Sequence, residues 1–157
     1  MALDPNNPQD EAKLTQTLQR WADGKATLRE VRGYTDDELY SIARTAYLFY
    51  YQGRLNEART LFQGLYAVSP TDSYFAKALG VVEMAAGNPQ GALAAYDVAL
   101  KLDARDAQAY VGRAEVRLSL GQKAQALEDL RRISSLVEAD EPLAHKAEAM
   151  MTALTQR

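Results

Sequence analysis

The sequence of 157 residues contains no cysteine and a single histidine, His145. Without cysteine the chain can form neither disulfides nor thiolate metal sites. A histidine-based metal cluster or a nucleophilic catalytic site would depend on His145 alone. We therefore expect no cofactor and no metal, and the residue types present favour a binding protein over an enzyme.

Long apolar runs and basic stretches are also missing. No apolar run approaches the roughly 20 residues that span a bilayer, so we expect no membrane insertion. The net charge is −3, with acidic and basic residues interleaved, so no basic stripe favours nucleic acid. The segment 1–9 is polar and lacks the charged start and apolar centre of a secretory signal. These features predict a cytoplasmic protein.

The chain does contain an internal repeat of 34 residues. Four columns of similar residues recur at this period, namely a glycine (Gly53, Gly87, Gly121), two small residues (Ala46, Gly80, Ala114; Ala58, Ala92, Ala126) and a large apolar residue (Phe62, Tyr96, Leu130). The glycine can end a first helix in the left-handed conformation of a tight turn. The small residues allow two helices to approach closely, and the large residue fills the space between neighbouring units.

This pattern resembles the tetratricopeptide repeat, a pair of antiparallel helices 34 residues long. It predicts an all-α solenoid of three helix-turn-helix repeats with flanking terminal helices. The expected organisation is a disordered N-terminus (1–9), an N-terminal helix and connector (10–34), three repeats (35–138) and a C-terminal capping helix (139–157). The expected helices span 10–22, 35–52, 55–68, 72–86, 89–102, 106–120, 123–137 and 141–155.

Stacked helix pairs curve, and the first helices of the pairs line the concave side. With the repeat phased on Gly53, the inward positions are Tyr40, Ala43, Tyr47, Tyr50 and Tyr51 in copy one, Tyr74, Lys77, Val81, Met84 and Ala85 in copy two, and Gln108, Val111, Glu115, Leu118 and Ser119 in copy three. Five of the thirteen aromatic residues (one Trp, nine Tyr, three Phe) lie between Tyr40 and Tyr51. Tyrosine rings grip extended peptides while their hydroxyls bond to peptide carbonyls, so copy one predicts a peptide-binding groove.

Several of these residues also have a plainer interpretation. The copy-one tyrosines could be core, as we expect for Phe49, Tyr96 and Tyr110. The acidic run 36–38 lies in the first turn of a helix, where negative charge is favoured, and Thr35 with Glu38 forms a capping box. The charged residues of copy three predict a solvated face; they are Arg113, Arg117, Arg131 and Arg132 with Glu115, Glu128 and Asp129.

A second resemblance involves the segment before the repeats. The residues Thr27–Thr35, TLREVRGYT, precede the Glu38-Leu39-Tyr40 helix. They resemble the T-L-x-x-I-x-G-I-S lead-in of the bacterial type III secretion chaperones that serve translocator proteins. Shorter stretches also match: Gln52-Gly53-Arg54, Asp72-Ser73-Tyr74-Phe75, Leu79-Gly80, and Ala114-Glu115 before Gly121. The similarity runs from Thr27 to Ser135.

This resemblance implies a chaperone that keeps secreted translocators soluble in the bacterial cytoplasm. Such chaperones hold a proline- and leucine-containing client segment in the concave groove. Tyr47 and Tyr50 fall where the family carries aromatic groove residues, whereas Ala43 departs from a third aromatic. Because the family's N-terminal helix often contributes to a homodimer, the resemblance implies a dimerisation role for Leu14, Leu18 and Trp21. Packing of that helix against the chain's own repeats is the alternative.

Two other functions remain open from the sequence. The chain could be another tetratricopeptide adaptor or scaffold in a bacterial envelope or secretion complex. It could also be an enzyme, an interpretation that rests only on His145 and scattered carboxylates.

Overall fold

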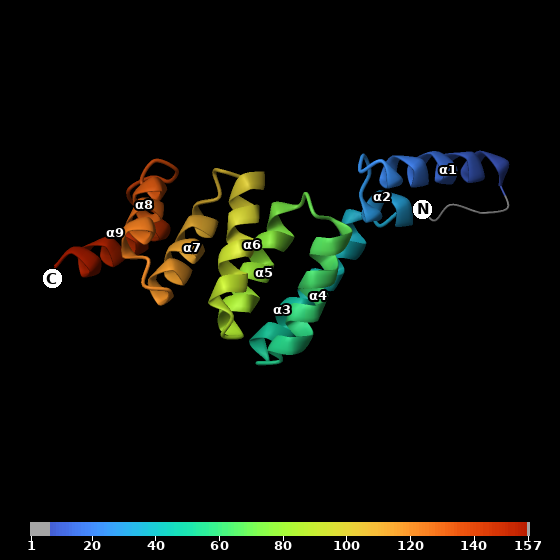
Figure 1. The fold of residues 1–157 in the computed structure, drawn as a ribbon. Coiled ribbons are helices and arrows are strands. Elements are labelled where there is room, and N and C mark those ends of the chain that lie inside the picture. Colours follow the sequence, from blue (N-terminus) through green and yellow to red (C-terminus); the bar gives the residue numbers. More distant parts are fainter. Residues whose placement is uncertain (1–6, 157) are drawn as a thin grey trace. The chain divides into compact units, whose positions relative to one another are not determined.

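The computed structural model describes residues 7–156, which are helical with no strand (Figure 1), as the sequence predicts. The helices are α1 (Pro8–Ala22), α2 (Leu28–Arg32), α3 (Asp36–Tyr51), α4 (Leu55–Val68), α5 (Ser73–Ala85), α6 (Pro89–Leu102), α7 (Ala107–Ser119), α8 (Lys123–Ile133) and α9 (Pro142–Thr155). Two compact units divide the chain at Thr71, with α1–α4 in unit 1 and α5–α9 in unit 2. Within residues 7–156, no helix is long and apolar enough to cross a membrane.

The three repeat glycines form the same turn in each copy. Gly53, Gly87 and Gly121 have φ values of 74°, 77° and 74°. In copy one, the Gly53 amide donates to the carbonyl of Tyr50 at 3.0 Å, and the Arg54 amide donates to that of Phe49 at 2.9 Å. Copies two and three repeat both bonds, which together satisfy the last carbonyls of each first helix. The 34-residue period of the sequence therefore corresponds to a turn that recurs every 34 residues in the structure.

The core of unit 1 lies between α3 and α4. Ala46 and Ala58 are fully buried, as their positions at the helix crossing predict, and Phe62 is also 0% exposed. Leu39 and Leu65 complete the buried set that joins the two helices. Helix α2 packs on α4, and α1 packs on α2.

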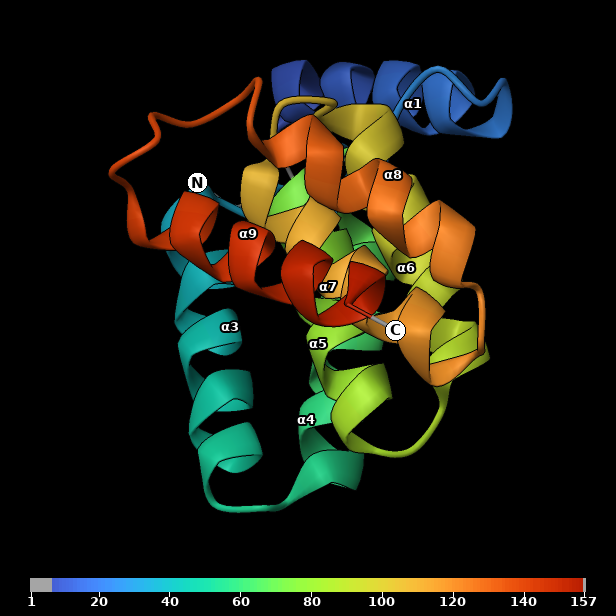
Figure 2. The same cartoon turned by 90° about the vertical axis from the view of Figure 1, so that its left-hand side faces the viewer.

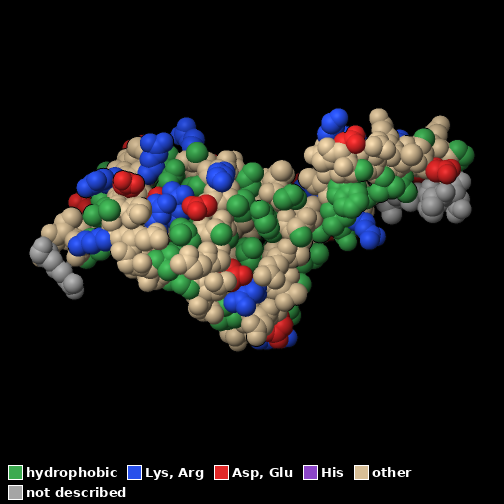
Figure 3. All heavy atoms as spheres, in the orientation of Figure 1, with side chains coloured by type: hydrophobic (Ala, Val, Ile, Leu, Met, Phe, Trp, Pro, Cys, Tyr) green, Lys and Arg blue, Asp and Glu red, His purple; other side chains and the backbone are tan. Residues whose placement is uncertain are grey.

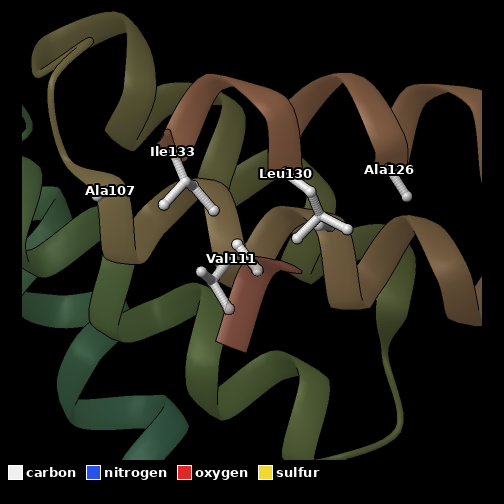
Figure 4. Close-up of a cluster of buried hydrophobic side chains, with 7 residues drawn as sticks. Ala107, Val111, Ala126, Leu130 and Ile133 are labelled. Carbon is white, nitrogen blue, oxygen red and sulfur yellow. The ribbon is translucent and has the colours of Figure 1, made fainter. Parts of the chain in front are cut away.

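In unit 2, α5 pairs with α6 and α7 pairs with α8. The ring of Tyr96, 5% exposed, lies against two glycines, because a Cβ on Gly80 or Gly112 would approach it to 3.0 Å or 2.4 Å. Tyr96 is thus core, as predicted. A second cluster joins Val111 of α7, Leu130 and Ile133 of α8, and Ala147 of α9 (Figure 4).

Helix α9 packs on α8 and α7, and lies across them in Figure 2. Its opposite side carries His145, Glu148 and Thr152, which are exposed. A polar outer face is what the terminal helix of a helical stack needs to stay in solution. The arrangement is therefore consistent with the predicted capping role of α9.

The predicted helix boundaries were wrong at three places. The predicted disorder of residues 1–6 lies outside the described residues, but Pro8 and Gln9 are helical because Asn7 caps the Gln9 amide and proline suits the first helical position. The connector 25–34 contains α2. Helix α8 ends at Ile133 instead of residue 137, because the Ser135 and Leu136 amides bond three residues back and tighten the last turn.

Candidate functional site

Three tyrosines of α3 form an aromatic cluster, here called the tyrosine cluster: Tyr47, Tyr50 and Tyr51. The ring centroids of Tyr47 and Tyr51 lie 6.4 Å apart in a stacked arrangement, and those of Tyr50 and Tyr51 lie 5.3 Å apart edge to face. Tyr47 and Tyr50 are also 6.4 Å apart. Spacings of three and four residues bring these side chains to one face of the helix, so the sequence alone determines that they meet.

The tyrosine cluster has a buried end and an exposed end. The Tyr47 ring contacts the fully buried Phe62 of α4, with centroids 4.9 Å apart. Tyr50 is half-buried, and Tyr51 is 79% exposed. Because Tyr47 is fixed against the core and Tyr51 is open to solvent, the cluster offers a rigid apolar surface at little cost in side-chain entropy.

The other two predicted copy-one residues differ from each other. Tyr40 is half-buried one helical turn after the start of α3. Ala43 is only 1% exposed, so its side chain belongs to the core. The prediction that Ala43 lines an accessible surface was wrong, because a methyl group at this position is too short to reach past its neighbours. Phe49, predicted as core, is only half-buried, and the Arg54 guanidinium lies 4.1 Å from its ring centroid.

The predicted copy-two residues lie on α5 in unit 2. Tyr74, Lys77, Val81 and Met84 are all half-buried. Val81 and Met84 pack against the cluster around Tyr96, and the Lys77 ammonium pairs with Asp106 at 2.6 Å. The Asp106 carboxylate also caps α7 by accepting the Ala109 amide. The positive charge of Lys77 is therefore already neutralised within the unit.

Copy three offers less accessible surface than predicted. Val111 is 4% exposed and points into the cluster shared with α8 and α9, and Leu118 packs against the same cluster. Glu115 forms an ion pair with Lys146 of α9 at 2.7 Å. The neighbouring helix α9 thus engages three of the five predicted inward positions.

The charged residues of copy three were predicted to form a solvated face, and this is wrong for Asp129, Arg113 and Arg117. Asp129 is 3% exposed and accepts two hydrogen bonds from Arg113, at 3.0 and 2.7 Å, and one from Arg117 at 2.8 Å. Arg113 also donates to Asp97 at 2.8 Å. Burial alone would lower the pKa of Arg113, but these two carboxylates outweigh it and raise the pKa. The prediction holds only for the exposed Arg131, Arg132 and Glu128 and for Glu115.

The three residues predicted for dimerisation do not pack into a core. Helix α1 has no buried residue; Leu14 is half-buried, Leu18 is 41% exposed and Trp21 is 49% exposed. Figure 3 shows hydrophobic side chains gathered along the lower side of α1. Dimerisation through this face and its packing against the chain's own repeats therefore both stay predictions.

An apolar groove between α3 and α4, here called the α3–α4 groove, was not predicted. It has a volume of about 210 Å³, and its lining residues are Tyr34, Leu39, Ile42, Thr60, Leu61, Gly64, Leu65 and Val68. Tyr34 and Ile42 are 40% and 38% exposed. The sequence signal was present, because Gly64 is a small residue on a helix face that otherwise carries Leu61 and Val68.

The remaining polar candidates have structural roles. Thr35 and Glu38 form the predicted capping box, in which the Thr35 amide and hydroxyl donate to the Glu38 carboxylate. These bonds lower the pKa of Glu38 from its ordinary value of 4.5. Asp36 accepts a hydrogen bond from Arg29. Among residues 7–156, no three His, Asp or Glu side chains are placed to hold a metal ion.

A repeated pair of antiparallel helices with a left-handed glycine at each turn is thus present in three copies. A profile of the tetratricopeptide repeat matches residues 43–106 and 77–141. The chain belongs to the tetratricopeptide repeat family.

Within the tetratricopeptide repeat family, the chain is similar to a narrower group of proteins. The chain is 28% identical over 159 residues to the chaperone protein SicA of Salmonella typhimurium, covering 99% of this chain and 96% of SicA. The type III secretion translocator chaperone SycD of Yersinia enterocolitica is 26% identical, with a TM-score of 0.72 over 77% of this chain and 86% of SycD. PcrH of Pseudomonas aeruginosa, in complex with the chaperone-binding region of PopD, is 26% identical, with a TM-score of 0.73 over 80% of this chain and 96% of PcrH. SycD and PcrH, two structural neighbours of this chain, are type III secretion translocator chaperones.

Proposed function

We propose that this chain is a chaperone that binds an extended segment of a secreted translocator protein and keeps that protein soluble in the bacterial cytoplasm before type III secretion. The tyrosine cluster of α3 is the surface that carries the proposal. Tyr40 in unit 1 and, in unit 2, the α5 residues Tyr74, Lys77, Val81 and Met84 also remain proposed client-binding residues. The chain acts by binding and not by catalysis.

The chemistry of the tyrosine cluster suits an unfolded apolar client. Tyr51 presents most of its ring to solvent, while Tyr47 fixes the cluster to the core through Phe62. Such rings accept apolar side chains of an extended peptide, and their hydroxyls reach peptide carbonyls. A few aromatic anchors can hold a client without requiring it to fold, and a modest affinity lets it be passed on.

The relatives support the same partner class. SycD has been seen with a peptide of the translocator YopD, and PcrH with the chaperone-binding regions of PopD and PopB. A translocator has segments destined for a bilayer, and unshielded apolar surface of that kind aggregates in water. A soluble partner that covers such segments before export solves this problem.

The test is co-expression of this chain with the translocators encoded in the same genome. We expect a translocator to be soluble and to co-purify only when this chain is present. A Tyr50→Ala, Tyr51→Ala double variant should reduce the captured amount and weaken client binding, because it removes the exposed part of the tyrosine cluster. Tyr47→Ala is a poorer probe, since it also removes the contact with Phe62 and so affects folding.

Leu48→Ala provides a matched control for this experiment. Leu48 lies on the same helix and is 55% exposed. Its truncation removes exposed apolar surface from α3 but keeps all three rings of the tyrosine cluster, so capture should stay intact. A translocator that stays soluble without this chain would refute the chaperone function. Capture that survives the double variant but fails in Leu48→Ala would instead favour an adaptor that binds partners through a surface other than the tyrosine cluster.

A further inference from the structure

Helix α9 is the least buried helix of unit 2. Ala147 is its only buried residue, whereas α7 buries five residues and α8 buries four. The side chain of its N-cap residue, Glu141, makes no hydrogen bond to the amides of the first turn. The ion pair between Lys146 and Glu115 leaves both side chains about half exposed, and pairs of this kind contribute little stability. Helix α9 is therefore held mainly by its apolar side.

The surface under α9 is apolar and belongs to two other helices. It is here called the α7–α8 face, and it consists of Val111 and Leu118 of α7 with Leu130 and Ile133 of α8. Leu130 and Ile133 are fully buried and point toward α7, where Val111 lies (Figure 4). Left open to water, such a surface would be a binding site or a cause of aggregation, so it needs a cover.

Helix α9 covers this face with a helical pattern of apolar side chains. They are Leu143, Ala147, Met150, Met151 and Leu154, separated by four, three, one and three residues. Two of the five are methionines, whose flexible side chains fill irregular gaps and are frequent at binding surfaces that accept several partners. An amphipathic helix with the same spacing can therefore make the same contacts.

The fit of α9 also leaves space unfilled. A hollow of about 380 Å³ lies beside its C-terminal half, and its lining residues are Leu118, Gly121, Lys123, Ala153 and Leu154. Ala153 stays exposed, because its methyl group is too short to fill the hollow. A competing helix with a larger apolar side chain in the place of Ala153 would contact Leu118 and bury surface that α9 leaves open.

We propose that α9 is a displaceable cover of the α7–α8 face, and that an amphipathic helix of the client takes its place. The inference rests on the proposed function, because the competing helix belongs to the translocator. Before the client binds, α9 keeps the face out of water; afterwards, the face shields the apolar side of the client helix. A client already held by its extended segment presents this helix at a raised local concentration, so the helix can compete with one in the same chain.

Locking α9 in place tests the displacement. The chain has no cysteine, so Glu115→Cys with Lys146→Cys supplies the only two thiols, at positions whose native side chains meet at 2.7 Å. A bis-maleimide with a disulfide in its spacer links α7 to α9, and a reductant later separates them. A translocator encoded in the same genome is diluted from denaturant into each form of the chain, and the amount kept in solution is measured. We expect the linked chain to keep less translocator than the unlinked double variant, and reduction to restore the full amount.

Lys146→Cys alone, treated with an excess of the same reagent, is the matched control, because it carries the adduct while α9 stays free. It should keep as much translocator as the unlinked double variant. Equal capture by the linked and the unlinked chain would overturn the inference while the proposed function stands. Loss of capture in every form would refute the proposed function itself.

A peptide tests the α7–α8 face without any client. The probe is a fluorescent synthetic peptide with the sequence of residues 141–156, and its binding is followed by anisotropy. Ala147→Glu puts a carboxylate into the apolar contact and should release α9, so this variant should bind the peptide. Ala149→Glu adds the same charge on the exposed side of α9 and should not bind it. Hydrogen exchange shows which helices are open in each variant.

Two results of the peptide experiment would overturn the inference. The first is no binding to Ala147→Glu although α9 is open and α7 and α8 stay protected, since the vacated face would then accept no helix. The second is a loss of protection in α7 and α8 together with α9. The three helices would then form one cooperative unit, and α9 could not leave alone.

Discussion

Arg113 and Asp129 form a two-pronged ion pair inside unit 2, with Arg113 Nε 3.0 Å from Asp129 Oδ2 and Nη2 2.7 Å from Oδ1. The pair joins α7 to α8 at positions where copy two carries Leu79 and Ala95. The Arg113 side chain is 17% exposed and Asp129 is 3% exposed. Copy three therefore holds its two helices together with charge where copy two uses apolar side chains.

We predict that Asp129→Ala destabilises the chain by about 2–3 kcal/mol, less than the loss of a fully buried pair, because it takes the shared carboxylate from Arg113 and Arg117, whose side chains are each 17% exposed. Glu128→Ala is the control, since Glu128 is the exposed neighbouring carboxylate and its loss should cost less than about 0.5 kcal/mol. Urea unfolding of both variants measures the difference. Equal midpoints would mean that the cluster contributes no net stability.

Substitution by alanine should have opposite effects on stability at Gly112 and at Gly64. A Cβ on Gly112 would come within 2.4 Å of the buried Tyr96 ring, so Gly112→Ala should cost about 1–3 kcal/mol through overpacking. A Cβ on Gly64 meets nothing within 4 Å, so Gly64→Ala should stabilise the chain by about 0.5–1 kcal/mol through helix propensity. Thermal unfolding tests the sign of each effect. A gain in stability from Gly112→Ala would show that Tyr96 moves aside at no cost.

The helical repeat was predictable from the sequence because the glycines and the small residues each have one structural role. The glycine ends a helix in a tight turn, and the small residue lets two helices approach closely. The tyrosine cluster was predictable for the same reason, since helix periodicity alone places Tyr47 beside Tyr50 and Tyr51. Helix α2 was missed although Thr27 and Glu30 form the same capping box as Thr35 and Glu38. Five residues were too few for an apolar period to show, so the cap was the only signal.

Burial by distant neighbours could not be predicted from single positions. Asp129 looked solvated because its sequence neighbours are charged, but its partners, Arg113 and Arg117, come from another helix. Val111 occupies an inward position of the repeat, yet α9, outside the repeat, covers it. The α3–α4 groove likewise depends on how two helices cross, which the small residue Gly64 does not determine by itself.

The capping boxes predict acid sensitivity at the start of α3. Hydrogen bonds from Thr35 lower the pKa of Glu38 below 4.5, so the folded state favours its ionised form. The stabilising effect is fully present above pH 4.5 and is lost as the pH falls through the lower, folded-state pKa. Titration of the Glu38 carboxyl by NMR should show this depressed midpoint. Glu38→Gln keeps a capping side chain and should remove this part of the pH dependence of stability.

Asp106 should matter more for stability than its partner Lys77. The Asp106 carboxylate is 14% exposed, accepts the Ala109 amide at 3.0 Å and pairs with the Lys77 ammonium at 2.6 Å. Asp106→Ala removes both the helix cap, worth about 1 kcal/mol, and the ion pair. Lys77→Ala removes only the ion pair, whose side chains are partly exposed, and should cost less than about 1 kcal/mol. Chemical denaturation measures the loss of stability in each variant. A larger loss in Lys77→Ala than in Asp106→Ala would show that the lysine contributes more to stability than the helix cap does.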